Sequence, residues 1–301
     1  MKKLLFSRPA AIFFLTAITA IWGWSFVIVK ESVSVYPVFS FLSLRFFLGA
    51  VILAAFLGRS IFKMDRSTML AGCMLGLFLF GGYAFQTTGL LYTTPAHSGF
   101  ITGLFVVFTP VFESFIFKRK PHPAVVFSLV LSTVGLFVLS YDPGAEGINI
   151  GDFLSLICAI IYAFHLILID RWSKKHDTLG LAFLQVFTVS LLSLAAALMV
   201  RAHFAPVPPA AMKGILLTAV FATALSYYVQ TTFQKVTSAT EAALIFTLEP
   251  IFAGVFAYFM WGERITGRTV AGGLLIFAGI VISQVRYFFF GRTDGLVDEQ
   301  K

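Results

Sequence analysis

Charged side chains are scarce in this chain: 12% of its 301 residues are Asp, Glu, Lys or Arg, whereas 58% are hydrophobic and 36 are phenylalanine. A soluble domain of this size cannot bury so much apolar surface, so the balance indicates a polytopic membrane protein. The net charge of +8 does not indicate nucleic-acid binding, because the basic residues lie in short breaks between apolar runs. We therefore expect a lipid bilayer, and no nucleic acid, as a partner.

Cysteine is also nearly absent. Cys73 and Cys158 both lie inside apolar runs without a partner at a characteristic spacing, so neither a disulfide framework nor a cysteine metal site is indicated. The five histidines are scattered, and the sequence has no nucleophile elbow and no phosphate-binding loop. His165 and Asp170 have an acyltransferase-like spacing without the surrounding motif. We expect no cofactor, no metal and no enzymatic activity; a membrane-embedded enzyme or lipid transferase stays open as the alternative from another class.

Apolar runs separated by short breaks predict ten transmembrane helices, since about 20 helical residues cross the hydrocarbon core. The predicted spans are 10–29, 36–57, 69–91, 96–117, 123–141, 151–170, 178–200, 211–233, 240–261 and 269–290. The first run has basic residues before it but no clean cleavage site after it, so we expect a retained span rather than a secretory signal. The short breaks leave no room for a soluble domain, and the predicted fold class is an all-α integral membrane protein.

Lysine and arginine are unequally divided between the two sets of loops. If the N-terminus is cytoplasmic, sixteen lie on the inner side and five on the outer side, the outer ones being Lys30, Arg201, Lys213, Arg264 and Arg268. Because positive charge favours the cytoplasmic side, this asymmetry predicts that both termini are cytoplasmic, in the inner membrane of the cell.

The two halves of the sequence resemble each other. Four residues of the third span recur 144 positions later in the eighth: Tyr83, Gln86, Thr87 and Thr88 match Tyr227, Gln230, Thr231 and Thr232. At a shift of 140, Trp22 matches Tyr162, Ser25 matches His165, and Thr109-Pro110 matches Glu249-Pro250. Because a repeat of five spans is odd, the second copy must be inserted upside down, as in transporters whose site lies between the repeats.

This repeat predicts two inverted five-helix units around a central cavity. The expected division is a cytoplasmic N-terminus at 1–9, a first repeat at 10–141, an external linker at 142–150, a second repeat at 151–290 and a cytoplasmic tail at 291–301.

Two charged residues lie deep inside predicted spans. A carboxylate such as Glu249 costs about 2.5 to 3.5 kcal/mol there, and Pro250 removes a helical hydrogen bond beside it. Glu249 either faces a cavity or is a protonated acid buried against a neighbouring helix. Arg45 cannot lose its charge and needs a carboxylate, backbone carbonyls or water. Glu249 is a candidate partner by depth; capping of broken-helix carbonyls is the alternative.

A polar stripe follows the fourth span and consists of Ser98, Thr102, Thr109 and Glu113. Intervals of four, seven and four place these residues on one helical face, and Gly99 and Gly103 beside them are expected to permit close helix packing. The stripe either lines a water-filled path or joins helices. An ion pair of Glu113 with Lys118 or Arg119, near the cytoplasmic end, is the alternative for that residue.

The candidate substrate-binding residues combine aromatic and polar side chains at the predicted depth of the cavity. They are Trp22, Ser25, Tyr83, Gln86, Phe100, Thr102, Tyr162, His165, Tyr227, Gln230 and Phe246, with Arg45 and Glu249 as the buried charges. Aromatic rings offer flat apolar walls and a cation-binding face, and His165 can change charge near neutral pH. The alternatives are an interhelical hydrogen bond for His165 and plain polar contacts between helices for Gln86 and Gln230.

Several of these residues belong to recognisable motifs. The sets that carry the resemblance are Trp22, Gly23, Ser25, Phe26 and Lys30; Leu44, Arg45 and Phe46; and Glu249, Pro250, Gly262, Glu263 and Arg264. They resemble the drug/metabolite transporter superfamily, EamA type, over nearly the whole chain. The resemblance implies ten spans in a basket-like bundle, with a cavity lined by the first, third, fourth, sixth, eighth and ninth spans. It also implies secondary transport of small metabolites, commonly amino acids or their relatives and often outward.

The chain departs from the family pattern at two places. The segment 118–120 is Lys-Arg-Lys where many members have a Gly-Glu pair, and the second half lacks the Trp-Gly signature. The halves therefore need not contribute equally to the site. We expect an exporter of small metabolites such as amino acids, working by alternating access with Glu249 as a candidate proton carrier. An antiporter of phosphorylated metabolites or nucleotide sugars is the alternative, and a monomer is compatible with the sequence.

Overall fold

The computed structural model describes residues 7–93, 95–118, 121–140, 149–261 and 266–290, and within these ranges the chain is helical without a strand. The elements are α2 (Arg8–Val35), α3 (Val38–Leu57), η1 (Gly58–Lys63), α4 (Arg66–Gly89), α5 (Pro95–Gly103), α6 (Phe105–Phe117), α7 (Pro123–Ser140), α8 (Ile150–Ser173), α9 (Thr178–Met199), α10 (Pro209–Leu217), η2 (Thr218–Leu225), α11 (Ser226–Gln234), α12 (Ala239–Phe246), α13 (Glu249–Trp261) and α14 (Gly267–Phe290).

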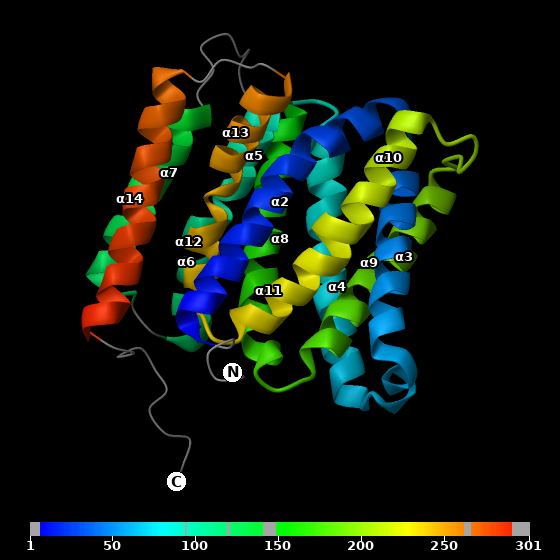
Figure 1. Ribbon diagram of the computed structural model, residues 1–301, viewed down its shortest axis with the longest axis horizontal. Coiled ribbons are helices and arrows are strands. Elements are labelled where there is room, and N and C mark those ends of the chain that lie inside the picture. Colours follow the sequence, from blue (N-terminus) through cyan, green and yellow to red (C-terminus); the bar gives the residue numbers. More distant parts are fainter. Residues whose placement is uncertain (1–6, 94, 119–120, 141–148, 262–265, 291–301) are drawn as a thin grey trace.

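The chain is an all-α membrane protein, as the composition predicts. Eight helical segments of the described residues are long and apolar enough to cross a bilayer, and two shorter apolar segments, Pro123–Val138 and Gly267–Ile282, lie in α7 and α14. The number of ten crossings stays a prediction. The helices lie roughly alongside one another, with α7 and α14 adjacent at one edge of the bundle (Figure 1).

The two halves enter the bundle from opposite ends. In Figure 1, α2 begins at the lower end, the same end at which α14 finishes, whereas α8 begins at the upper end. Polar caps fix several of these starts. Asp65 accepts the Thr68 backbone N–H at 2.7 Å where α4 begins, and the N-caps Asn149 and Ser238 form capping boxes with Asp152 and Glu241 at the starts of α8 and α12.

Three of the predicted spans are not continuous α-helices. The fourth breaks at Leu104 between α5 and α6, and the ninth breaks at residues 247–248 between α12 and α13. The eighth contains η2, a π-helical stretch between α10 and α11. The break at Leu104 lies between Thr102 and Thr109, and the shared face of Ser98, Thr102, Thr109 and Glu113 stays a prediction.

Glycines allow some of these helices to approach closely. A Cβ added to Gly135 of α7 would lie 2.7 Å from the Gly272 carbonyl oxygen of α14. The close contact between α7 and α14 therefore requires a residue without a side chain at position 135. Gly103 faces the Leu136 side chain, where an added Cβ would lie 3.1 Å away. The expected role of Gly99 is wrong, because nothing lies within 4 Å of the position of its missing Cβ.

Candidate functional site

The helices line a cavity that gathers most of the predicted site residues. Its volume is about 80 Å³, enough for more than one water molecule. The lining side chains are Trp22, Ser25, Phe26, Val29, Arg45, Leu79, Tyr83, Gln86, Thr87, Leu90, Thr102, Phe105, Tyr162, His165, Leu166, Tyr227, Gln230, Phe246 and Glu249. They come from α2, α3, α4, α5, α6, α8, α11, α12 and α13, together with Leu90 after α4. The cavity therefore lies where the two halves of the chain meet.

Aromatic rings form much of the wall. Trp22 meets Phe246 edge to face with 5.1 Å between ring centroids, and it lies 5.8 Å from Tyr227. Tyr83 packs edge to face against Tyr162 at 6.1 Å. Edge-to-face contacts hold rings in defined orientations, so the wall is both apolar and shaped.

Two glycines make room for this arrangement. A Cβ on Gly82 of α4 would lie 1.9 Å from a ring carbon of Tyr162, so the ring occupies space that only glycine leaves free. A Cβ on Gly23 of α2 would lie 2.7 Å from the Glu249 carbonyl oxygen. Gly23 thus lets α2 pass directly beside the start of α13, where Glu249 is placed.

Arg45 is buried, with 1% of its surface exposed, and its recorded partners are neutral. Its Nε donates to the Thr223 hydroxyl at 2.8 Å, and its Nη2 donates to the Tyr83 hydroxyl at 3.4 Å and the Ala222 carbonyl at 3.3 Å. No ion pair joins Arg45 to Glu249 among the described residues, so the expected direct pairing is wrong. The carbonyl interaction matches the alternative in which Arg45 caps a broken helix.

The broken helix in question is the π-helical stretch η2. Its Ala222 carbonyl accepts hydrogen bonds from Arg45 and from the Trp22 indole N–H, the latter at 3.1 Å. A π-helical turn redirects backbone carbonyls away from the regular i to i−4 pattern, and such turns are frequent at functional sites. No residue pattern in 218–225 predicts a π turn, so the sequence analysis did not identify it.

Glu249 is the first residue of α13 and is half-buried at the cavity. Its side chain makes no hydrogen bond or ion pair with another residue that the structure describes. It is the one acidic residue in the cavity wall. A cavity-facing position is the first of the two interpretations predicted for it.

His165 takes part in a buried hydrogen-bond chain. Its Nε2 lies 2.9 Å from Gln185 Oε1, and the Gln185 amide donates to the Thr231 hydroxyl at 3.0 Å. Since the Gln185 amide nitrogen already serves Thr231, its oxygen accepts from His165 Nε2–H. The interhelical hydrogen bond considered as the alternative for His165 is therefore present, while the residue also lines the cavity.

Phe100 is the one predicted site residue that does not line the cavity. Its ring lies 6.0 Å from that of Phe137 in α7, where it packs against the core. Phe105, just after the Leu104 break, lines the cavity instead. Most of the lining residues that sequence reasoning missed are apolar, namely Phe26, Val29, Leu79, Leu90, Phe105 and Leu166, and an apolar residue in an apolar span carries no distinguishing signal. Thr87 had a signal, since it belongs to the repeated four-residue match.

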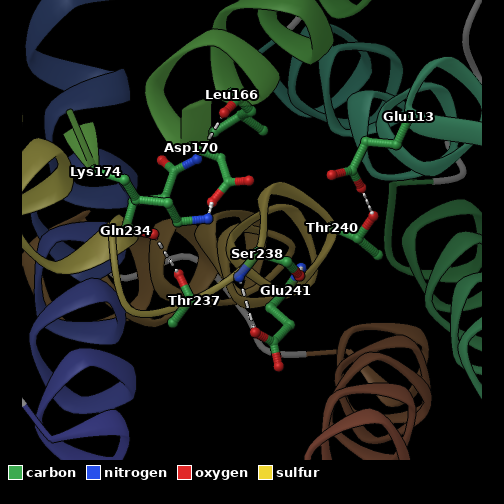
Figure 2. Close-up of polar contacts among 9 residues, drawn as sticks. All are labelled: Glu113, Leu166, Asp170, Lys174, Gln234, Thr237, Ser238, Thr240 and Glu241. Atoms are coloured by element: carbon green, nitrogen blue, oxygen red, sulfur yellow. Dashed lines mark hydrogen bonds and ion pairs between the residues drawn. The ribbon is translucent and has the colours of Figure 1, made fainter. Parts of the chain in front are cut away.

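Polar contacts join the two halves at the end of the bundle where α2 begins. Arg8 of α2 forms an ion pair with Glu241 at the start of α12, and the neighbouring Thr240 donates to Glu113 of α6. Figure 2 shows Thr240 pointing to Glu113, with Glu241 turned back toward Ser238. We call these two links the end contacts. The predicted partners of Glu113 are not the ones found: the contact is with Thr240 rather than Lys118, and Arg119 lies outside the described residues.

A model of the EamA-like transporter family matches residues 9–141 and 149–284. The chain belongs to the EamA-like transporter family. This EamA-like protein is a multi-pass membrane transporter and not an enzyme.

Relatives of this EamA-like transporter agree with that assignment. An uncharacterized transporter of Archaeoglobus fulgidus is 32% identical over 272 residues, 90% of this chain and 85% of the relative. A protein of Salmonella typhimurium named "Probable amino-acid metabolite efflux pump" is 25% identical over 279 residues, 88% of this chain and 92% of its own. A solved crystal structure superposes with a TM-score of 0.76 at 17% identity, covering 93% of this chain and 98% of the other, and supports the fold.

Proposed function

We propose that this chain is a secondary active transporter that exports small metabolites such as amino acids by alternating access. One observation carries the proposal: Arg45 and Glu249 line the same cavity without pairing with each other. In the proposed setting the protein lies in the inner membrane with both termini in the cytoplasm, and residues 10–141 and 151–290 act as inverted repeats.

The arrangement of charges supports a zwitterionic cargo. The guanidinium of Arg45 has neutral partners and matches a carboxylate in geometry, while the Glu249 carboxylate suits an ammonium group. The aromatic wall between α2, α4, α8 and α11 suits the apolar body of the cargo. The name of the Salmonella typhimurium relative supports the same class. Arg45 is the one Lys or Arg side chain in the wall, which disfavours phosphorylated metabolites and nucleotide sugars.

Interrupted helices support alternating access. The fourth span is interrupted between α5 and α6 and the ninth between α12 and α13, and residues on both sides of each break line the cavity. The wall extends from the middle of the bundle to Leu90, beyond the last residue of α4. The end contacts join the halves at the opposite end. We infer that this conformation is closed on the side of the end contacts, and that transport requires them to separate.

Glu249 is the proposed proton carrier, because it is the one acidic side chain in the wall. The test is transport of radiolabelled amino acids by the purified protein in proteoliposomes, with and without a proton gradient, from pH 5.5 to 8. Glu249→Gln should abolish the dependence on the gradient, because an amide cannot release a proton. Glu31→Gln, at an exposed position of α2, is the matched control. An unchanged pH profile in Glu249→Gln would remove the coupling role, and absence of transport of any amino acid by the wild type would remove the cargo class.

A further inference from the structure

Two residues that line the cavity each have a buried side-chain oxygen without a hydrogen-bond partner among the residues that the structure describes. Gln230 Oε1 on α11 and Thr102 Oγ1 on α5 are both buried, and both residues line the cavity. Exposed fractions are 2% for Gln230 and 5% for Thr102. A buried oxygen without a donor is destabilising, so its retention calls for an explanation. Binding of a cargo donor group supplies one.

The amide of Gln230 is oriented by its neighbour one helical turn away. Gln230 Nε2 donates to Gln234 Oε1 at 3.3 Å, and Gln234 Nε2 donates to the Leu166 carbonyl of α8 at 2.7 Å. Figure 2 shows the Gln234 amide directed at Leu166. Because the Leu166 carbonyl can only accept, the direction of both amides follows from it. The unpaired end of Gln230 is therefore its oxygen, which can only accept a hydrogen bond.

The same wall contains a carboxylate that can also accept hydrogen bonds from an amino group. This carboxylate belongs to Glu249, the first residue of α13, whereas Thr102 lies in the last turn of α5, just before the break at Leu104. A primary ammonium has three N–H donors and no acceptor. Gln230 Oε1, Thr102 Oγ1 and the Glu249 carboxylate together supply an acceptor for each of these donors. Arg45, which only donates, does not compete for the same group.

We propose that Gln230 Oε1, together with the Thr102 hydroxyl, accepts hydrogen bonds from the amino group of the cargo, and that Gln230 thereby determines specificity for amine-bearing molecules. Gln234 acts as a positioning residue that sets the direction of the Gln230 amide. This inference rests on the proposed amino-acid cargo and adds to it the residues that distinguish an amine from its deaminated analogue. A site built to pair a donor rejects the analogue that lacks it, because the acceptor then stays unpaired.

The test measures dissociation constants of the purified full-length protein in detergent by calorimetry. The probes are leucine, phenylalanine and threonine, each with its decarboxylated amine and its deaminated acid. Wild type should bind the amino acids and the amines more tightly than the deaminated acids. Gln230→Met should weaken binding of the amine-bearing probes about tenfold and leave the deaminated acids unchanged. Gln230→Glu, which keeps the acceptor oxygens, should retain the preference, and Gln234→Met should reduce it in part.

A matched control separates recognition from simple burial cost. Ser193 Oγ on α9 is also buried without a partner, but Ser193 does not line the cavity, so Ser193→Ala should leave all nine affinities unchanged. If Gln230→Met keeps the full preference for amines, this inference is wrong while the amino-acid cargo stands. If the wild type binds none of the probes, or only the deaminated acids, both proposals fail. Should Gln230→Met not fold, loss of the preference in Gln230→Glu would refute the inference equally.

Discussion

Tyr83 and Tyr227, which occupy matching positions in the two halves of the sequence, are joined by a hydrogen bond in which the Tyr227 hydroxyl donates to the Tyr83 hydroxyl at 2.8 Å. The Tyr83 hydroxyl also accepts from Arg45. Residues related by the repeat therefore contact each other directly across the cavity wall, and the buried charge of Arg45 is connected to both halves through them. A change in the relative position of the halves must alter this contact.

Arg45→Lys should lower transport by about tenfold or more, although the charge is kept. The guanidinium contacts Thr223, Tyr83 and Ala222 at the same time, and a lysine ammonium cannot reproduce that planar set of donors. Initial rates in proteoliposomes give the measurement. Arg59→Lys, at an exposed position of η1, should transport at the wild-type rate. Normal transport by Arg45→Lys would show that charge alone suffices.

Gly82→Ala should destabilise the protein by about 1 to 3 kcal/mol and weaken cargo binding, because the new methyl group overlaps the Tyr162 ring. Gly99→Ala provides the control: nothing lies within 4 Å of its new methyl group, and alanine favours the helix. Thermal melting in detergent distinguishes the two. If both variants melt at the wild-type temperature, the close packing of α4 against Tyr162 does not hold in solution.

Arg8→Gln should raise the chemical reactivity of a cysteine introduced at Ala243, a fully buried position of α12, about two- to fivefold. The reason is that the Arg8–Glu241 ion pair opposes separation of the halves at this end. The measurement is the labelling rate with N-ethylmaleimide after Cys73→Ser and Cys158→Ala. Lys213→Gln, which removes a positive charge at an exposed position of α10, serves as the control. Equal labelling rates in all variants would exclude a role for the end contacts in closure.

Asp65, the N-cap of α4 outside the predicted membrane spans, should make the stability of the protein depend on pH. The backbone N–H and the hydroxyl of Thr68 donate to this carboxylate and, with the nearby His176, hold its pKa below the ordinary value. Because the folded-state pKa is lowered, the stabilisation is complete above the unfolded value of about 3.9 and is lost as pH falls through the folded value. The difference in melting temperature between wild type and Asp65→Asn should therefore shrink from pH 6 to pH 3. A constant difference would contradict this account.

The sequence located much of the cavity wall because polar side chains in apolar spans are informative. Trp22, Tyr83, His165 and Gln230 were singled out for that reason, and all four line one cavity. Their roles in binding stay proposals. An apolar wall residue such as Leu79 has no such signal, since it differs from its lipid-facing neighbours only by its position on the helix.

Backbone irregularity explains the remaining differences. Phe100 was expected in the cavity, but its ring packs against Phe137 of α7, and Phe105, which follows the break at Leu104, lines the cavity instead. Glu249 was a candidate partner for Arg45 because both lie at a similar depth, whereas Arg45 donates to Thr223 and Ala222 of η2 and to Tyr83 of α4. Depth along a span can be estimated from residue number, but the direction of a side chain around the axis depends on every irregular turn before it.

The π-helical stretch at 218–225 determines the direction in which the side chains after it point. A π turn holds one residue more than an α-turn, and each residue of an α-helix turns the chain by about 100°. Converting Thr218–Leu225 into a plain α-helix without removing a residue would therefore rotate the preceding and following segments against each other by about that angle. Tyr227 and Gln230 would then point toward other neighbours, although neither of them had been altered.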